Sequence, residues 1–178
     1  MNTNNIKKYA PLARREFIAA VGKRLNQFGV YTKGKTLSIS EPSFSGSVMQ
    51  IDGNSFDAGL AQARKRLTLR AEQLGFDALV EQVAYTWFNR LCAIRFMELK
   101  SDYLEHGLRV LSHPEKVNGF EILDHAQDVA EPLGLDRSHI VELKLAGNKD
   151  EELYRHLLLG QCHQLHKAMP FLFEASHV

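Results

Sequence analysis

The most apolar stretch of the chain, residues 77–99, predicts a helix that is buried on several sides. Apolar residues recur there at every third or fourth position, which is the spacing of one helical face. The residues of this stripe are Val80, Ala84, Trp87, Leu91 and Ile94. Further apolar residues widen the stripe around the helix, namely Leu79, Val83, Phe88, Cys92, Met97 and Leu99. A helix that is apolar over most of its circumference packs against several neighbours, so we expect it at the centre of a mainly α, multi-helix fold.

Two further helices are predicted before this segment. The first runs from Pro11 to Phe28, because Pro is favoured in a first turn and Gly29 suits the position after a helix end. The second covers residues 57–74 and is ended by Gly75. Residues at helical spacing are expected to face inward, with Ile18, Val21, Leu25 and Phe28 in the first helix and Leu60, Ala63, Leu67, Ala71 and Leu74 in the second.

Between these two helices the hydrophobic period changes. Residues 36–40 alternate between polar and apolar, and Val48 and Ile51 precede the turn sequence Asp52-Gly53. We therefore expect a short β-hairpin or an irregular insert over residues 35–56.

Shorter helices follow the central one. Helical patterns cover residues 103–111, 120–130, 139–145 and 148–168. Asp102 with Glu105 forms a capping pattern for the first of them, and Asn148 with Glu151 opens the last, which Pro170 stops. We interpret residues 1–178 as a single domain, and the apolar aromatic end of the chain as a join to a longer protein.

The composition fits a folded protein of the cytoplasm. The 178 residues are 44% hydrophobic and 24% charged, as in an ordinary globular domain. No apolar run approaches the ~20 residues that span a bilayer, and the first residues lack the apolar segment of a secretory signal. Cys92 and Cys162 are too few for a disulfide framework, so we interpret them as free thiols in a reducing cytoplasm. We expect no membrane partner.

The net charge of +1 hides an asymmetry along the chain. Residues 1–35 hold eight Lys/Arg and one Glu, a net +7, whereas residues 101–178 hold seven Lys/Arg and thirteen Asp/Glu, a net −6. A polyanion can bind the basic part, although the two ends can also simply attract each other within the fold.

Basic residues on the predicted helices and the N-terminal arm are candidates for contact with the backbone of double-stranded DNA. The helix over residues 57–74 is expected to carry four of them on its outer face, opposite its apolar stripe. The alternative is an ordinary solvated helix face. The full set of candidates is Lys7, Lys8, Arg14, Arg15, Lys23, Arg24, Arg64, Lys65, Arg66 and Arg70.

Residues Gly29–Thr36 match the phosphate-binding pattern G-x-x-x-x-G-K-T letter for letter. That motif works when a strand delivers the loop and a helix follows it, so that the helix N-terminus faces the phosphates. Here the order is reversed, because a helix precedes the motif and a strand-like alternation follows it. We interpret the segment as a basic turn after a helix end.

Metal-binding and catalytic residues are not predicted. Cys162 and His166 share one helical face and His156 and His163 another, and two faces do not converge on one zinc ion. The sequence has neither a G-x-S-x-G elbow nor a G-x-G nucleotide-binding core. We therefore assign no catalytic, cofactor-binding or metal-ligating residue to this chain.

Residues Glu81–Leu99 closely resemble the N-terminal region of the PglX family, the adenine-specific DNA methyltransferases of type 1 BREX phage-defence systems. Residues Met1–Pro11, His106–Pro114 and Tyr154–Glu174 resemble the same region. Such enzymes methylate adenine N6 with S-adenosylmethionine, which they bind through a Gly-rich loop. They flip the target base toward an Asn-Pro-Pro-aromatic motif. Neither motif occurs here, so the methyltransferase core is absent from this chain.

The resemblance implies a non-catalytic N-terminal domain that supports DNA backbone binding and docks on the catalytic core of the parent enzyme. S-adenosylmethionine is expected as the cofactor of the full-length parent, and no cofactor is expected in this chain. The alternative is a protein-interaction module that binds other BREX proteins or a phage inhibitor through its acidic C-terminal part.

Overall fold

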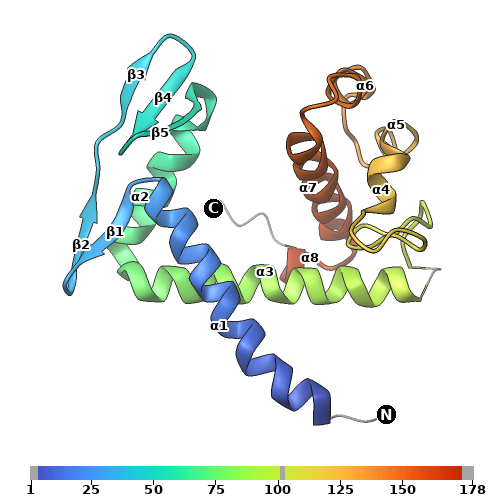
Figure 1. Ribbon diagram of the computed structural model, residues 1–178, viewed down its shortest axis with the longest axis horizontal. Helices are drawn as coiled ribbons and strands as arrows, with labels where there is room; N and C mark the ends of the chain where they lie inside the picture. Colours follow the sequence, from blue (N-terminus) through green and yellow to red (C-terminus); the bar gives the residue numbers. More distant parts are fainter. Residues whose placement is uncertain (1–3, 101–102, 174–178) are drawn as a thin grey trace. The chain divides into compact units, whose positions relative to one another are not determined.

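The computed structural model describes residues 4–100 and 103–173, and it is mainly helical with small β-sheets (Figure 1). The predicted mainly α fold is confirmed. The chain divides after Phe88 into two compact units, which we call unit 1 and unit 2. Helix α3 (Phe76–Leu99) contributes residues to both units. Two compact units can belong to one folding domain, so the single domain inferred from the sequence stays a prediction.

Unit 1 begins with helix α1 (Asn4–Gln27), which starts earlier than predicted and contains Pro11 inside it. The placement of Pro11 in a first turn was therefore wrong. An internal proline removes a hydrogen bond from the helix. The side chains of Tyr9 and Leu12 beside it are exposed, so this end of α1 is not packed in the core.

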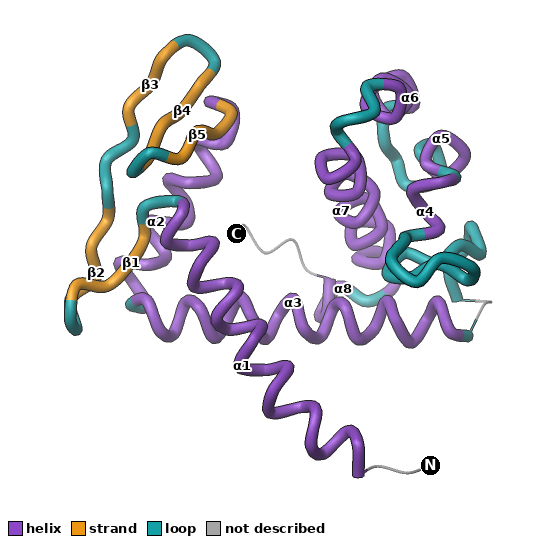
Figure 2. The backbone as a smooth tube through the Cα atoms, in the orientation of Figure 1, coloured by secondary structure: helices purple, strands orange, loops and turns teal. Residues whose placement is uncertain are grey.

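Two antiparallel sheets replace the single hairpin or irregular insert that the sequence suggested (Figure 2). Strands β1 (Val30–Lys33) and β2 (Thr36–Ile39) form a hairpin in which Lys33 is opposite Thr36. Strands β3 (Ser43–Ser45), β4 (Val48–Ile51) and β5 (Asn54–Asp57) form a meander. Strand structure thus begins upstream of the predicted bounds, directly after the end of α1.

The alternation in β4 explains how this meander is anchored. Met49 and Ile51 are buried, whereas Val48 and Gln50 between them are exposed. The following turn places Asp52 and Gly53 at positive φ, 47° and 81°, which two-residue hairpin turns require and which Asp and Gly tolerate best.

Helix α2 (Ala61–Leu74) follows a 3₁₀ turn, η1 (Ala58–Leu60), whose first free amide is capped by the Asp57 carboxylate. Its buried face differs from the predicted one. Leu67 and Ala71 are buried as expected, but Ala63 and Leu74 are exposed. The remaining buried position of this helix is occupied by an arginine, Arg64.

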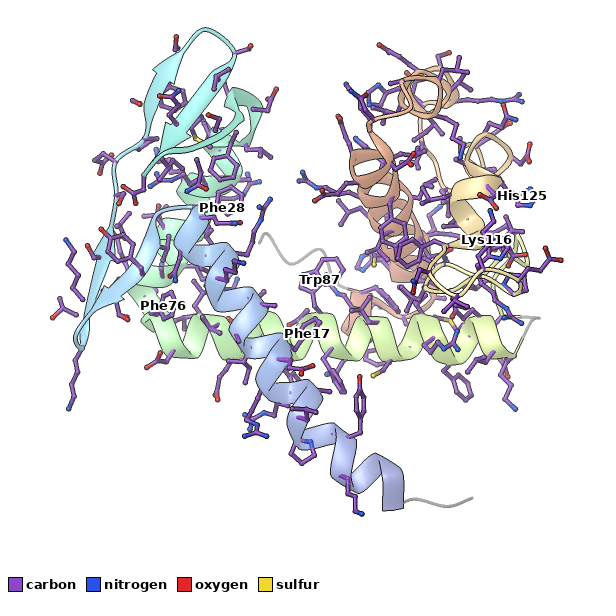
Figure 3. All side chains as sticks on the ribbon, in the orientation of Figure 1. Phe17, Phe28, Phe76, Trp87, Lys116 and His125 are labelled. Atoms are coloured by element: carbon purple, nitrogen blue, oxygen red, sulfur yellow. The ribbon has the colours of Figure 1, made fainter. Side chains whose placement is uncertain are left out.

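The core of unit 1 joins α1, β1, α2 and α3. Partly buried side chains, including Ile18, Val21 and Phe28, pack around it. Phe28, labelled in Figure 3, stacks on Phe56 of β5 with the two ring centroids 4.5 Å apart. The buried members of this core are Leu25, Val30, Leu67, Ala71, Leu79 and Val80.

Unit 2 combines the second half of α3 with short helices and one long one. These are α4 (Glu121–Asp124), α5 (Ala126–Val129), α6 (Arg137–Leu145), α7 (Asp150–Ala168) and α8 (Pro170–Phe173). The helix predicted over 120–130 is thus split at His125, and Pro170 opens a helix as well as ending one. No side chain caps α7, so the predicted cap by Asn148 is wrong.

The helix predicted over residues 103–111 is also wrong, because the described residues 103–111 form turns and extended loop. The predicted cap, Asp102, lies outside the described residues. The loop instead bonds to the buried carboxylate of Glu98. That carboxylate accepts hydrogen bonds from the backbone amides of Val110 at 2.9 Å and Leu111 at 2.8 Å. A helical conformation would use these amides internally.

Helix α3 is less completely covered than its sequence pattern suggested. Ala84 and Ile94 are buried as predicted. Phe88, Cys92 and Leu99, which were expected to widen the buried stripe, are exposed. None of the described helices combines the length and apolarity needed to cross a membrane.

Candidate nucleic-acid interface

The charge asymmetry of the sequence coincides with the division into units. Unit 1 holds twelve Lys/Arg and seven Asp/Glu, a net +5, and unit 2 holds ten and fourteen, a net −4. The two values sum to the +1 of the whole chain. All candidate DNA-backbone residues lie in unit 1, so this unit carries the positive charge that attracts a polyanion.

One face of α1 carries three exposed basic residues in a row. Lys8, Arg15 and Lys23 are exposed, and their spacings of seven and eight residues place them on one side of a helix that turns about 100° per residue. Val21 and Phe28, which pack against the core, lie on the opposite side of the helix. We call Lys8, Arg15 and Lys23 the α1 basic row. The side chain of Lys7 lies outside the described residues.

Two other arginines of α1 have partners within unit 1. Arg14 pairs with Glu81 of α3 at 3.2 Å, and both side chains are largely exposed. Arg24 donates to the Gln27 side chain at 2.9 Å, and its guanidinium lies 4.9 Å from the ring centre of Phe28. Exposed pairs of this kind contribute less than about 1 kcal/mol, so neither arginine is prevented from meeting a phosphate.

Helix α2 divides its basic residues between the surface and the interior. Lys65 and Arg66 are exposed, and Arg70 is partly buried and donates to Gln82 at 3.2 Å. Arg64 was expected on the outer face, and this is wrong, because the residue is 8% exposed. The hairpin and the end of α1 supply backbone carbonyls next to Arg64. The hydrophobic periodicity of α2 alone does not reveal these partners.

The Arg64 guanidinium donates hydrogen bonds to these carbonyls. Its Nε donates to the carbonyl oxygen of Phe28 at 3.1 Å, and its Nη2 donates to that of Ser40. Burial lowers the pKa of Arg64, while Glu41 and Asp52 act in the opposite direction. Arg64 is therefore a structural residue, and it is not available to a phosphate.

The β1–β2 hairpin adds two lysines that were counted in the charge but not proposed as DNA contacts. Lys33 and Lys35 are exposed at its tip. The sequence Gly29–Thr36 forms this hairpin, since β1 ends at Lys33 and β2 begins at Thr36. The interpretation of the P-loop match as a turn is confirmed, because a strand and not a helix follows the loop.

The exposed basic residues of unit 1 form separate groups. Leu25 of α1 and Leu67 of α2 meet in the same core, so the two helices turn their basic sides away from that core and from each other. The α1 basic row, the pair Lys65 and Arg66, and the hairpin tip therefore occupy different parts of the surface. The α1 basic row is the longest of them.

Helix α7 carries Cys162 and His163 as neighbours near the C-terminus. Cys162 is buried and His163 is exposed on the same helix, so these neighbours point to different sides. Burial raises the pKa of the Cys162 thiol to about 11, although Arg90 acts in the opposite direction. Such a thiol is protonated at neutral pH and is a poor nucleophile.

Comparison with known proteins identifies the chain as a homologue of part of the adenine-specific methyltransferases. It is 54% identical over 177 residues to the adenine-specific methyltransferase BrxX of Escherichia coli O9:H4 (strain HS), a match that covers 98% of this chain. It is 31% identical over 190 residues to the adenine-specific methyltransferase PglX of Lacticaseibacillus casei (strain Zhang), covering 99% of this chain. The resemblance found in the sequence is thereby confirmed.

The chain spans only 15% of the E. coli relative and 16% of the L. casei relative. No protein-family profile matches the chain.

Proposed function

We propose that this chain is a non-catalytic, N-terminal part of a phage-defence adenine methyltransferase and that it holds the DNA backbone through unit 1. The α1 basic row carries the proposal. Its three cations are exposed on one helical face, and none of them forms an ion pair with a carboxylate among the described residues. The unit around them has a net charge of +5. Such a row fits a sequence-independent phosphate contact.

Catalysis belongs, on this proposal, to the remainder of the longer protein. Neither an Asn-Pro-Pro motif nor a G-x-G loop occurs in the chain, so S-adenosylmethionine and the flipped adenine would be bound elsewhere. The parent enzyme would act in the cytoplasm, where the DNA is. Phosphate contacts in unit 1 would raise affinity and fix orientation without selecting the sequence that is methylated.

The test measures the affinity of the chain for a fluorescent duplex by anisotropy at several salt concentrations. Each phosphate neutralised contributes about −0.9 to the slope of log affinity against log salt. We expect a dissociation constant of about 10⁻⁴ to 10⁻⁶ M, as for non-specific binding. The variant Lys8→Ala/Arg15→Ala/Lys23→Ala should flatten the slope by about 2.7.

A matched control removes three exposed charges from unit 2 by Lys100→Ala/Arg137→Ala/Lys167→Ala, residues that are all exposed. It changes the net charge by the same amount, so a specific role for the α1 basic row requires that the control keeps most of the slope. Equal losses in the two variants would contradict the proposal. So would the absence of DNA binding by the wild type at about 50 mM salt, where phosphate contacts are strong.

A second candidate function, docking on the catalytic core of the same enzyme, is favoured by exposed apolar side chains in unit 2. Phe96 and Leu99 at the end of α3 are 58% and 59% exposed, and Tyr103 is 63% exposed. The rings of Phe96 and Tyr103 lie 6.3 Å apart. Exposed aromatic clusters of this kind commonly mark interaction sites.

We propose the catalytic core as the occupant because about 85% of each relative lies outside the matched region. The test adds the purified remainder of the E. coli relative and measures complex formation by size-exclusion chromatography. Phe96→Ser/Leu99→Ser should abolish the complex, whereas Tyr9→Ser, an exposed aromatic of unit 1, should not. Normal binding by the variant would contradict docking through this cluster.

A further inference from the structure

Three potential metal ligands from two helices meet in unit 2. His139 lies in the first turn of α6, and Glu152 and His156 lie four residues apart on α7, which places both on one face of that helix. One ligand atom of each residue lies within 4.8 Å of the other two. The two imidazole rings meet edge to face, with centroids 5.2 Å apart.

The chemistry of this set matches a zinc-type ion. Two imidazoles and one carboxylate are the protein ligands of several zinc sites, in which water takes a fourth position. Ligand atoms around tetrahedral zinc are separated by about 3.3 Å, given bond lengths of about 2.0 to 2.2 Å. The ligand atoms would therefore have to approach one another by roughly 1 to 2 Å. Side-chain rotations can provide this movement without a shift of the helices, since the residues are at least partly exposed.

The surroundings also favour a cation. Unit 2 has a net charge of −4, and a Glu142 carboxylate oxygen lies 4.0 Å from Nδ1 of His139. At 4.0 Å this carboxylate makes no hydrogen bond to the ring, but its negative charge favours a cation nearby.

Competing charges are present but weak. Nζ of Lys149 lies 3.6 Å from a carboxylate oxygen of Glu152, and both side chains are about half exposed. An ion pair of that exposure is worth less than about 1 kcal/mol, so a metal ion can displace the ammonium group from the carboxylate.

We propose that His139, Glu152 and His156 bind one divalent transition-metal ion of the zinc class, which links α6 to α7. This inference is independent of the proposed DNA function. The pattern was not recognised from the sequence because His156 was grouped there with its neighbours on α7. His139, the partner that completes the set, lies 17 residues earlier on a different helix.

The test uses the whole chain after treatment with EDTA, and titrates it calorimetrically with zinc chloride and with magnesium chloride. We expect about one equivalent of zinc to bind and magnesium not to compete, because nitrogen ligands favour zinc. His139→Ala, His156→Ala and Glu152→Gln should each weaken zinc binding at least about tenfold, the loss typical of a missing ligand or outer-shell partner.

The matched control is His163→Ala, which removes an exposed histidine from the same helix α7. It should bind zinc as the wild type does. Circular dichroism checks that each variant keeps its helices, and Glu152→Gln preserves the size of the side chain. Cobalt provides a second readout, because its visible absorption should appear with the wild type and be lost with His139→Ala. Zinc binding that survives in His139→Ala/His156→Ala, or that falls equally in His163→Ala, would overturn the proposal.

Discussion

Arg64 donates from Nε to the carbonyl oxygen of Phe28 at 3.1 Å, across 36 positions of sequence. Its other contact, to the Ser40 carbonyl, connects the same guanidinium to the end of the β1–β2 hairpin. A single side chain from α2 thereby links the residue after the end of α1 to the residue after the end of the hairpin. Both carbonyls lie outside regular helical bonding, so they need donors from elsewhere.

We expect Arg64→Ala to destabilise unit 1. It would remove two charge-assisted hydrogen bonds and leave partly buried carbonyls without donors, which costs about 2 to 4 kcal/mol. Arg66→Ala, on the exposed face of the same helix, should change stability by less than about 0.5 kcal/mol. Urea unfolding followed by circular dichroism measures both. Equal midpoints for the two variants would show that the Arg64 contacts do not support the fold.

Glu98 has a comparable role in unit 2. Its side chain is 0% exposed and accepts the Val110 and Leu111 amides, the Ser112 hydroxyl at 3.1 Å and the Arg95 guanidinium. Glu98→Ala should cost about 2 to 5 kcal/mol, because buried amide donors would lose their acceptor. Glu115→Ala, at an exposed position of the neighbouring loop, is the control. Thermal unfolding measures the difference, and a Glu98→Ala variant as stable as the control would contradict this role.

The two cysteines should differ sharply in reactivity. Cys92 is exposed, whereas Cys162 is buried with a pKa of about 11. At pH 8, iodoacetamide should modify Cys92 first, since only roughly one in a thousand Cys162 thiols would be ionised even if reached. Mass spectrometry of the modified chain locates the label.

The pH dependence of stability follows from the same shift. The folded state keeps the Cys162 proton to a higher pH than the unfolded state, whose thiol has a pKa of 9.0. Its contribution to stability is therefore complete below about pH 9 and is lost as the pH rises toward about 11. Cys162→Ser should remove this part of the loss of stability at alkaline pH. Urea unfolding midpoints measured between about pH 8 and about pH 11 would check it.

Helical periodicity located the long helices because one apolar side of each meets a core, although it placed the start of α1 at Pro11 and not at Asn4. α3 is the clearest example, since its predicted range, 77–99, differs from the observed Phe76–Leu99 by one residue. Periodicity failed where a side chain outside the segment decides the conformation. In the loop over residues 103–111, the amides of Val110 and Leu111 bond to the Glu98 carboxylate and not to helical carbonyls. Glu98 lies outside the loop, so the pattern of residues within the loop does not indicate this contact.

The candidate sites show the same division. The three residues of the α1 basic row were all among the sequence candidates. The sequence placed Lys8 in an arm before the helix, however, and the shared face appears only because α1 begins at Asn4. Arg64 was misplaced, because its carbonyl partners come from the end of α1 and the hairpin. The cluster of His139, Glu152 and His156 depends on how two helices pack, and a single sequence does not contain that information.

The division of charge between the units has a consequence for handling the protein. The chain has a net charge of +1, but its units have net charges of +5 and −4. It should therefore migrate little in an electric field and still bind to charged surfaces. It should be retained by both cation- and anion-exchange resins near neutral pH. In dilute buffer, the basic unit of one molecule attracts the acidic unit of the next, so moderate salt should increase solubility by screening that attraction.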